Sequence, residues 1–290
     1  MKIGSEEHKE FFCRHFVQTY THYDPETLPW PDLDEAALRR IRSVPFWQEV
    51  FFTERRAGAL VSAFNETVQD PVLKEAIGLQ GEEEARHANL IRVMIRRYGI
   101  QAEELPLEPL PADIETAFKD FGFGECVDSF LGFGVFKIAR QSDFLPESMF
   151  KIFDVLMYEE TRHIVFFVNW MAYNQARNGV AARSLLPFVS FVYYLRAFKR
   201  MLGVAQRGAA KDDGKEFAVT QANLFLDGFT FRRFLEDCYS ENRRRLSEFG
   251  PEMLRPNFLP QLAATALGAL RLWSFKSGPR SAETTHSVRK

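Results

Sequence analysis

Apolar residues recur every three or four positions along most of this chain, which is the period of helices that bury one face. The strict alternation of apolar and polar residues that marks half-buried strands is scarce. The pattern therefore predicts an all-α fold. From this period, and from prolines and glycines at suitable ends, we expect helices at residues 5–20, 34–42, 45–68, 70–98 and 146–177.

Breaks in the pattern divide the chain into four parts. Prolines mark residues 100–111 as a loop, and Gly122 and Gly124 indicate that residues 112–142 hold a short helix followed by a long one. Four long helices in succession predict a four-helix bundle. The expected parts are an N-terminal helical extension at 1–44, the bundle at 45–178, a C-terminal helical extension packed on it at 179–276, with a polar linker at 208–215, and a disordered tail at 277–290.

Composition narrows the class of protein. The formal net charge of −2 comes from 37 basic and 39 acidic residues, so nothing indicates a nucleic-acid partner. The three cysteines are widely separated, which is typical of a reducing cytosol. The first residues are too polar for a signal peptide, and the longest apolar stretch, 185–198, is interrupted by Pro187 and Arg196. We therefore expect a cytoplasmic protein without an integral membrane segment.

One short motif occurs twice: EEEARH, which ends at His87, returns as YEETRH, which ends at His163. Residues three positions apart lie on one face of a helix, so Glu84 with His87 and Glu160 with His163 each present half of a metal chelate. Between residues 23 and 285 the chain has no other histidine. The faces that carry these histidines are otherwise apolar, with Leu73, Ile77, Ile91 and Met94 in the first helix and Phe153, Leu156, Phe167 and Met171 in the second. Charged pairs on a buried face are costly unless a metal compensates them, so the motif predicts a metal site.

Two further helices should each add one inward carboxylate. Glu54 precedes Glu84 by 30 residues, and Glu125 precedes Glu160 by 35 residues. Such separations are expected of antiparallel helices joined by a short loop, so the chain reads Glu…Glu-X-X-His twice. The spacing leaves three alternative ligands open: Glu83 and Glu159, four positions before the histidines, and Glu49 in place of Glu54.

Three other charged residues, Arg86, Arg162 and Asp128, lie near these ligands in the sequence. Arg86 and Arg162 are rotated by about 160° from Glu84 and Glu160, so we expect them at the bundle exterior or paired with neighbouring acids. Asp128, one turn after Glu125, would either hold a histidine N–H or form a salt bridge between helices.

With these residues the sequence resembles the ferritin-like di-iron carboxylate proteins, which include the small subunit of ribonucleotide reductase. Their bundles use one Glu from each of two helices and Glu-X-X-His from each of the other two. The resemblance covers roughly residues 45–178. It implies two metal ions about 3.5–4 Å apart, usually two iron ions and sometimes a manganese and iron pair, with O2 as co-substrate. The implied metal ligands and catalytic residues are Glu54, Glu84, His87, Glu125, Glu160 and His163.

Small residues near the expected metal level predict a pocket for an apolar ligand. Gly132 lies two turns past Glu125, Gly58 lies one turn past Glu54, and Gly81 precedes Glu84. The alternative is that these glycines allow helices to pack closely. The aromatic residues expected to line the pocket are Phe51, Phe121, Phe136 and Phe167.

The function expected first is an O2-dependent oxidase or oxygenase that acts on a small apolar organic substrate. It would need an electron donor such as a ferredoxin or a flavin reductase, and a homodimer is one arrangement it allows. The alternative is a ferroxidase or iron-binding ferritin-like protein, which the long segment after residue 178 disfavours. The amphipathic stretch at 261–276 either docks on the bundle or contacts a membrane surface.

Overall fold

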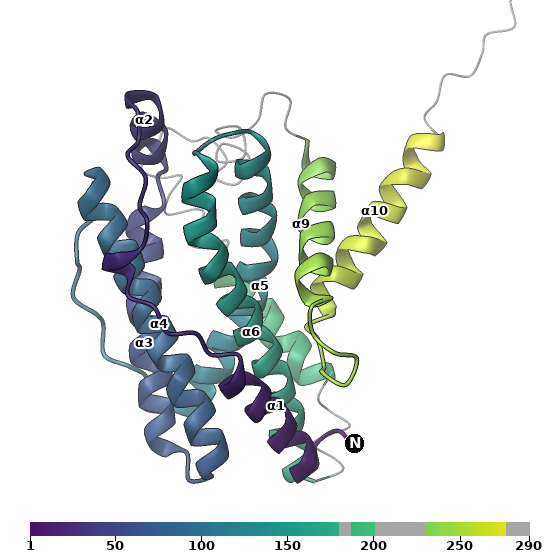
Figure 1. The fold of residues 1–290 in the computed structure, drawn as a ribbon. Helices are drawn as coiled ribbons and strands as arrows, with labels where there is room; N and C mark the ends of the chain where they lie inside the picture. The colour runs from purple at the N-terminus through teal and green to yellow at the C-terminus, as the bar shows by residue number, and fades with distance from the viewer. Residues whose placement is uncertain (180–186, 201–229, 277–290) are drawn as a thin grey trace, which may run out of the picture.

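The computed structural model describes residues 1–179, 187–200 and 230–276, and every regular element in these ranges is helical (Figure 1). The all-α prediction is therefore confirmed for this part of the chain. The linker expected at 208–215 and the tail expected at 277–290 lie outside the described residues. Besides a helical stretch at 187–200, the elements are α1 (Glu6–Gln18), the 3-10 turn η1 (Pro25–Thr27), α2 (Glu35–Ser43), α3 (Trp47–Thr67), α4 (Pro71–Tyr98), α5 (Ile114–Gln141), α6 (Glu147–Arg177), α9 (Phe231–Leu246) and α10 (Phe258–Lys276).

Four long helices, α3 to α6, stand side by side and form the centre of the fold (Figure 1). The ends of α4 follow from the sequence. The Asp70 carboxylate accepts hydrogen bonds from the backbone N–H groups of Val72 and Leu73, and Pro71 occupies the first turn. Gly99 ends the helix with φ +61°, a left-handed conformation that glycine adopts without a steric cost.

The expected break in residues 112–142 is wrong, because α5 runs without interruption from Ile114 to Gln141. Gly122 and Gly134 of α5 sit where another group lies against the backbone. A side chain at Gly122 would collide with the ring of Phe167, and one at Gly134 would collide with Cys238 of α9. Helix packing thus offsets the roughly 1 kcal/mol that each glycine costs relative to alanine in a helix.

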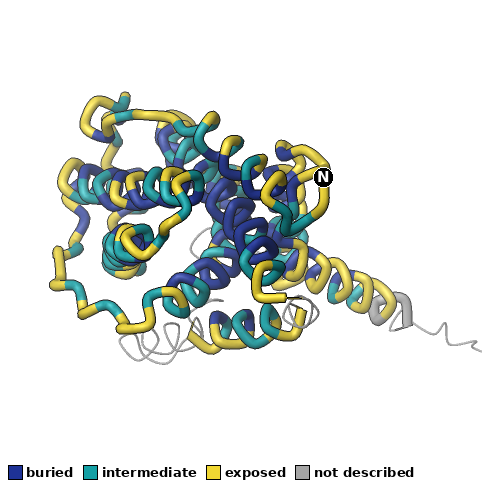
Figure 2. Tube along the Cα trace, turned by 90° about the horizontal axis from the view of Figure 1, so that it is seen from below, coloured by how far each residue is buried: buried dark blue, intermediate teal, exposed yellow. Residues whose placement is uncertain are grey.

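The core consists of two apolar clusters separated by a polar layer. Along α4, Ile77 belongs to the first cluster and Leu90 to the second; along α6, Ile164 belongs to the first and Leu156 to the second. The two Glu-Glu-X-Arg-His motifs occupy the buried turns between these residues. The buried parts of the helices gather near the middle of the molecule in Figure 2. Of the apolar positions predicted to face inward, all are buried except Phe153, which is half-buried.

Both extensions are fastened to α6 through one buried amide, that of Asn169. His8 of α1 donates from Nε2 to Asn169 Oδ1 at 2.9 Å. The same amide exchanges two hydrogen bonds with the backbone of Leu254, at 3.0 and 2.9 Å. His8 Nδ1 accepts from the backbone N–H of Gly4, so both ring nitrogens are used by the neutral imidazole. Burial accordingly lowers the pKa of His8.

The C-terminal extension packs against the central helices where it is described. Cys238 of α9 contacts Gly134 of α5, while Leu259, Ala263 and Leu267 of α10 are buried. All three cysteines of the chain are buried and free. Within the described ranges, no helix combines the length and the apolar character needed to cross a membrane.

Replacement of Asn169 tests how the extensions are held. Asn169→Ala leaves His8 Nε2 and the Leu254 backbone without partners in a buried place, so we expect the free energy of unfolding to fall by about 2–4 kcal/mol. Asn174→Ala, the same change at a more exposed position of α6, should alter it by less than about 0.5 kcal/mol. Urea unfolding of both variants checks this, and equal losses would contradict the role assigned to Asn169.

Candidate metal centre

Helices α4 and α6 bring the two repeated motifs face to face. Glu84, His87, Glu160 and His163 each offer one ligand atom, and these atoms all lie within 4.8 Å of one another. All four residues are buried. The i, i+3 spacing within each helix places a carboxylate and an imidazole on the same inward face, as the sequence predicted.

Each of the two central carboxylates spans both histidines. Glu160 Oε1 lies 3.0 Å from His87 Nδ1, and Glu160 Oε2 lies 3.9 Å from His163 Nδ1. Glu84 mirrors this arrangement, with Oε1 3.1 Å from His163 Nδ1 and Oε2 3.9 Å from His87 Nδ1. Each of the two carboxylates thus presents one oxygen to each imidazole.

The two outer carboxylates lie beside this group. Glu54 Oε2 of α3 is 3.6 Å from His87 Nδ1, whereas the alternative residue, Glu49, is exposed. Glu125 of α5 lies close enough to Glu160 and Glu84 to feel their charges. The structure therefore brings all six sequence-predicted residues to one place, with Glu54 and Glu125 flanking the tight group of four.

The first glutamate of each motif holds the histidine of the other motif. His87 donates from Nε2 to Glu159 at 2.8 Å, and His163 donates from Nε2 to Glu83 at 2.8 Å. These two carboxylates, considered above as alternative ligands, thus lie on the outer side of the imidazoles. They fix each ring with Nδ1 directed at the central carboxylates.

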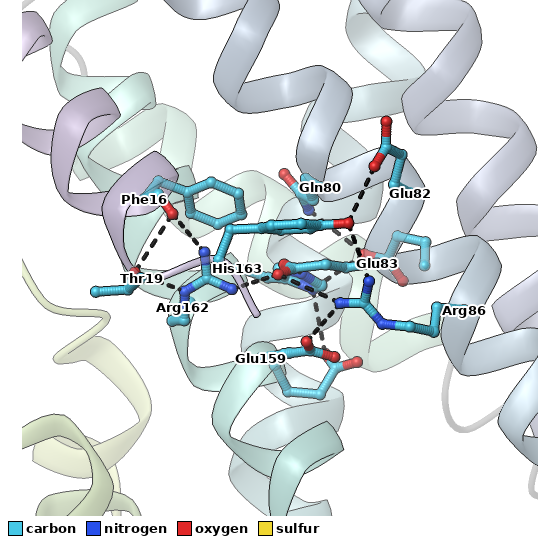
Figure 3. Close-up of polar contacts among 12 residues, drawn as sticks. Phe16, Thr19, Gln80, Glu82, Glu83, Arg86, Glu159, Arg162 and His163 are labelled. Carbon is cyan, nitrogen blue, oxygen red and sulfur yellow. Dashed lines mark hydrogen bonds and ion pairs between the residues drawn. The ribbon is translucent and has the colours of Figure 1, made fainter. Parts of the chain in front are cut away.

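The arginine of each motif pairs with the same outer carboxylates, as Figure 3 shows. Arg86 Nη2 lies 2.6 Å from Glu159 Oε1, and Arg162 Nη1 is paired with Glu83. The expectation of pairing with acids is confirmed, but neither arginine reaches the exterior, since both are buried. The N-terminal segment covers them: Arg162 donates to the Phe16 carbonyl and to Thr19, and Arg86 donates to Tyr20.

Sequence reasoning missed the tyrosines of this layer. Tyr23 donates to Glu159 Oε2 at 3.2 Å, and its ring lies 4.5 Å from the Arg86 guanidinium. Tyr20 donates to Glu82 while it accepts from Arg86. Both tyrosines lie in the connection after α1, where no helical period relates them to the motifs, so no pattern in the sequence pointed to them.

Crowding of carboxylates shapes the electrostatics of the centre. Burial raises the pKa of Glu54 to about 7. Burial, together with the charges of Glu160 and Glu84, raises the pKa of Glu125 well above its usual range. Burial opposes ionisation of Glu160 as well, but the His87 imidazole beside it lowers its pKa to about 2. Without a cation, burial therefore opposes ionisation of the two outer carboxylates, Glu54 and Glu125, at neutral pH.

The donor set fits a divalent metal ion. The Nδ1 atoms of His87 and His163 are buried and make no hydrogen bond, while each Nε2 is held by a carboxylate. Nitrogen and carboxylate oxygen donors in this mixture suit iron, manganese and zinc rather than calcium or magnesium. Two divalent cations would also balance the four negative charges of the central and flanking glutamates. The buried group of four could hold a metal ion.

The centre is closed on one side and more open on the other. Glu84, His87 and His163 are at most 1% exposed, whereas the side chain of Glu54 on α3 is 17% exposed. Glu125 of α5 is only half-buried. Asp128 is exposed and does not hold a histidine N–H, since both Nε2 atoms bind Glu159 and Glu83. Glu54 and Glu125 are therefore the members of this group that are nearest to solvent.

The glycines expected around a pocket behave differently from one another. A Cβ atom at Gly58 would lie 3.2 Å from the backbone nitrogen of Ala85, and one at Gly81 would lie 3.1 Å from the Ser62 hydroxyl, so both allow close packing of α3 on α4. A Cβ atom at Gly132 would meet nothing within 4 Å. The four phenylalanines expected to line one pocket are divided between the two core clusters, Phe121 and Phe167 in one and Phe51 and Phe136 in the other.

Comparison with known proteins gives no further assignment: no family model, no curated protein and no solved structure matches the chain.

The reciprocal hydrogen bonds can be tested through metal affinity. Glu83→Gln keeps the shape of the side chain but removes the charge that holds His163 and Arg162, so we expect affinity for Fe(II) to fall by about 10–100-fold. Glu82→Gln changes the exposed neighbour and should leave affinity unchanged. Competition with a chromophoric chelator measures both, and circular dichroism checks the helix content. Equal affinities for the two variants would reject an orienting role for Glu83.

Proposed function

We propose that this chain is a ferritin-like di-metal carboxylate protein that uses O2 to oxidise a small apolar organic substrate. The observation that carries the proposal is the pair of unbonded histidine Nδ1 atoms facing two carboxylates, each of which spans both rings. The same pattern of two single glutamates and two Glu-X-X-His motifs characterises di-iron bundles.

Six side chains would hold the metal pair. Glu84, His87, Glu160 and His163 would supply the four central ligands. The flanking pair would complete the set, with Glu54 on the His87 side. When bound, two iron ions, or a manganese and iron pair, would supply the electrons and the coordination positions for reduction of O2.

The rest of the polar layer would keep this site in shape. Glu159 and Glu83 fix the two imidazoles from behind, and the buried arginines hold those carboxylates in turn. Ligands that are already oriented lose little conformational entropy when a metal binds. Entry of O2 and substrate would use the more open side, between Glu54 and Glu125, and electrons would come from a donor such as a ferredoxin or a flavin reductase.

A ferroxidase is the second candidate, because the same open side is acidic. Glu54, Glu125 and the exposed Asp128 would attract a cation toward the centre, which suits a protein whose substrate is iron itself. The two candidates differ in what happens after the first oxidation.

Metal content and O2 uptake test the proposal together. We expect about two transition-metal ions per chain, and His87→Ala or His163→Ala should lower this number sharply while helix content stays, because each removes a ligand and leaves both apolar clusters in place. The di-ferrous protein should consume O2 once per site and then stop. Continued iron uptake with growth of a mineral core would favour the ferroxidase, and equal metal content in the wild type and both variants would reject the metal centre.

Two glycine substitutions separate a substrate chamber from helix packing. Gly132→Leu enters open space, so we expect an unchanged melting temperature and metal content but a loss of O2 uptake stimulated by medium-chain fatty acids, used as trial substrates. Gly58→Leu meets the backbone of α4 and should cost about 1–3 kcal/mol of stability. Loss of stability and metal together in Gly132→Leu would reject the chamber beside Gly132.

A further inference from the structure

The helical stretch at 187–200 has two apolar faces, of which only one is covered. Tyr194 and Ala197 are buried against the first core cluster. On the other side, Phe188, Phe191 and Leu195 are 66%, 45% and 52% exposed. Their spacing of three and four residues places them in one row along the helix.

This exposed row continues onto α10 through one aromatic residue. The ring of Phe258, at the start of α10, stacks on Tyr194 at 4.5 Å and meets the edge of Phe191 at 6.4 Å. Farther along α10, Leu262 and Leu272 are 52% and 68% exposed. In Figure 1 the later part of α10 runs away from the other helices, so the body of the molecule leaves it uncovered.

The charge of these two helices is one-sided. Neither 187–200 nor 258–276 contains Asp or Glu, although 39 of the 290 residues of the chain are acidic. Basic residues accompany the apolar ones: Lys199 follows Leu195 by four positions, in the same row as Phe188, and Arg271 precedes Leu272. Both Lys199 and Arg271 are exposed.

We propose that this apolar and basic face, formed by Phe188, Phe191, Leu195, Lys199, Phe258 and Leu262, rests on a membrane surface that carries anionic headgroups. Aromatic and leucine side chains would enter the boundary between headgroups and acyl chains, while Lys199 and Arg271 would contact phosphate groups. A protein–protein interface usually has a rim of polar side chains around its apolar centre. The complete lack of acids on both helices fits an anionic lipid surface better.

Co-sedimentation with vesicles tests the proposal on the full chain. We expect the protein to bind vesicles of phosphatidylcholine with phosphatidylglycerol and to bind phosphatidylcholine alone much more weakly. Phe188→Glu should weaken binding roughly tenfold or more, since the apolar contact is lost and a negative charge is added. Lys199→Gln should weaken binding to the anionic vesicles by about fivefold, and added salt should act in the same direction.

Leu105→Glu supplies a matched control, because Leu105 is 42% exposed in the loop between α4 and α5, far from α10 in Figure 1. It should bind vesicles like the wild type. Equal binding by Phe188→Glu and the wild type, or no binding of the wild type to anionic vesicles, would overturn the proposal. A stable dimer in sedimentation velocity that Phe188→Glu dissociates would overturn it as well, since a second copy would then cover the face.

A fluorescent label on this face tests the proposal without the added negative charge of Phe188→Glu. The native cysteines are buried, so a fluorophore on Phe191→Cys reports on this face alone. Its emission should shift to the blue with anionic vesicles, whereas a label on Leu105→Cys should not respond. Metal content should be the same in all these variants, so the outcome does not depend on the metal centre.

Discussion

The reciprocal hydrogen bonds between the two motifs determine how the central helices are arranged. His87 is held by Glu159 of α6, and His163 is held by Glu83 of α4. Neither helix orients its own imidazole, because the glutamate that accepts from each histidine Nε2 belongs to the other helix. Each copy of the motif supplies the carboxylate that holds the histidine of the other copy. These hydrogen bonds fix the rotation of α4 and α6 and their positions along each other.

The charged side chains of the polar layer need partners on its outer side as well as at its centre. The outer carboxylates are paired with Arg86 and Arg162, and burying two guanidinium groups in turn requires acceptors. The N-terminal segment supplies these acceptors through Tyr20, Thr19 and the Phe16 carbonyl. The extension before α3 is thus part of the centre, and the Asn169 amide that fastens α1 to α6 supports the same layer from one side.

How much the sequence could predict depended on whether the information was local. Helix ends at Asp70-Pro71 and Gly99 followed from local backbone chemistry, and so did the pairing of Glu84 with His87 on one face. The position of Arg86 did not. A rotation of about 160° from Glu84 points away from the facing helix, and only the unpredicted packing of the N-terminal segment makes that side an interior. In the same way, Gly122 resembles a helix break until the ring of Phe167 is seen to occupy the space beside it.

Repetition of the motif does not make the two halves of the centre equivalent. Glu159 accepts a hydrogen bond from the Tyr23 phenol in addition to those from His87 and Arg86. Glu83 has no tyrosine donor among the described residues; it is hydrogen-bonded to His163 and Arg162, and Arg86 lies 3.7 Å away as an ion-pair partner. A third donor draws negative charge away from Glu159, so the imidazole that it holds should be the weaker electron donor at Nδ1. Two sequence copies that supply the same ligand types therefore create two chemically different positions, and the difference comes from a loop that lies outside both copies.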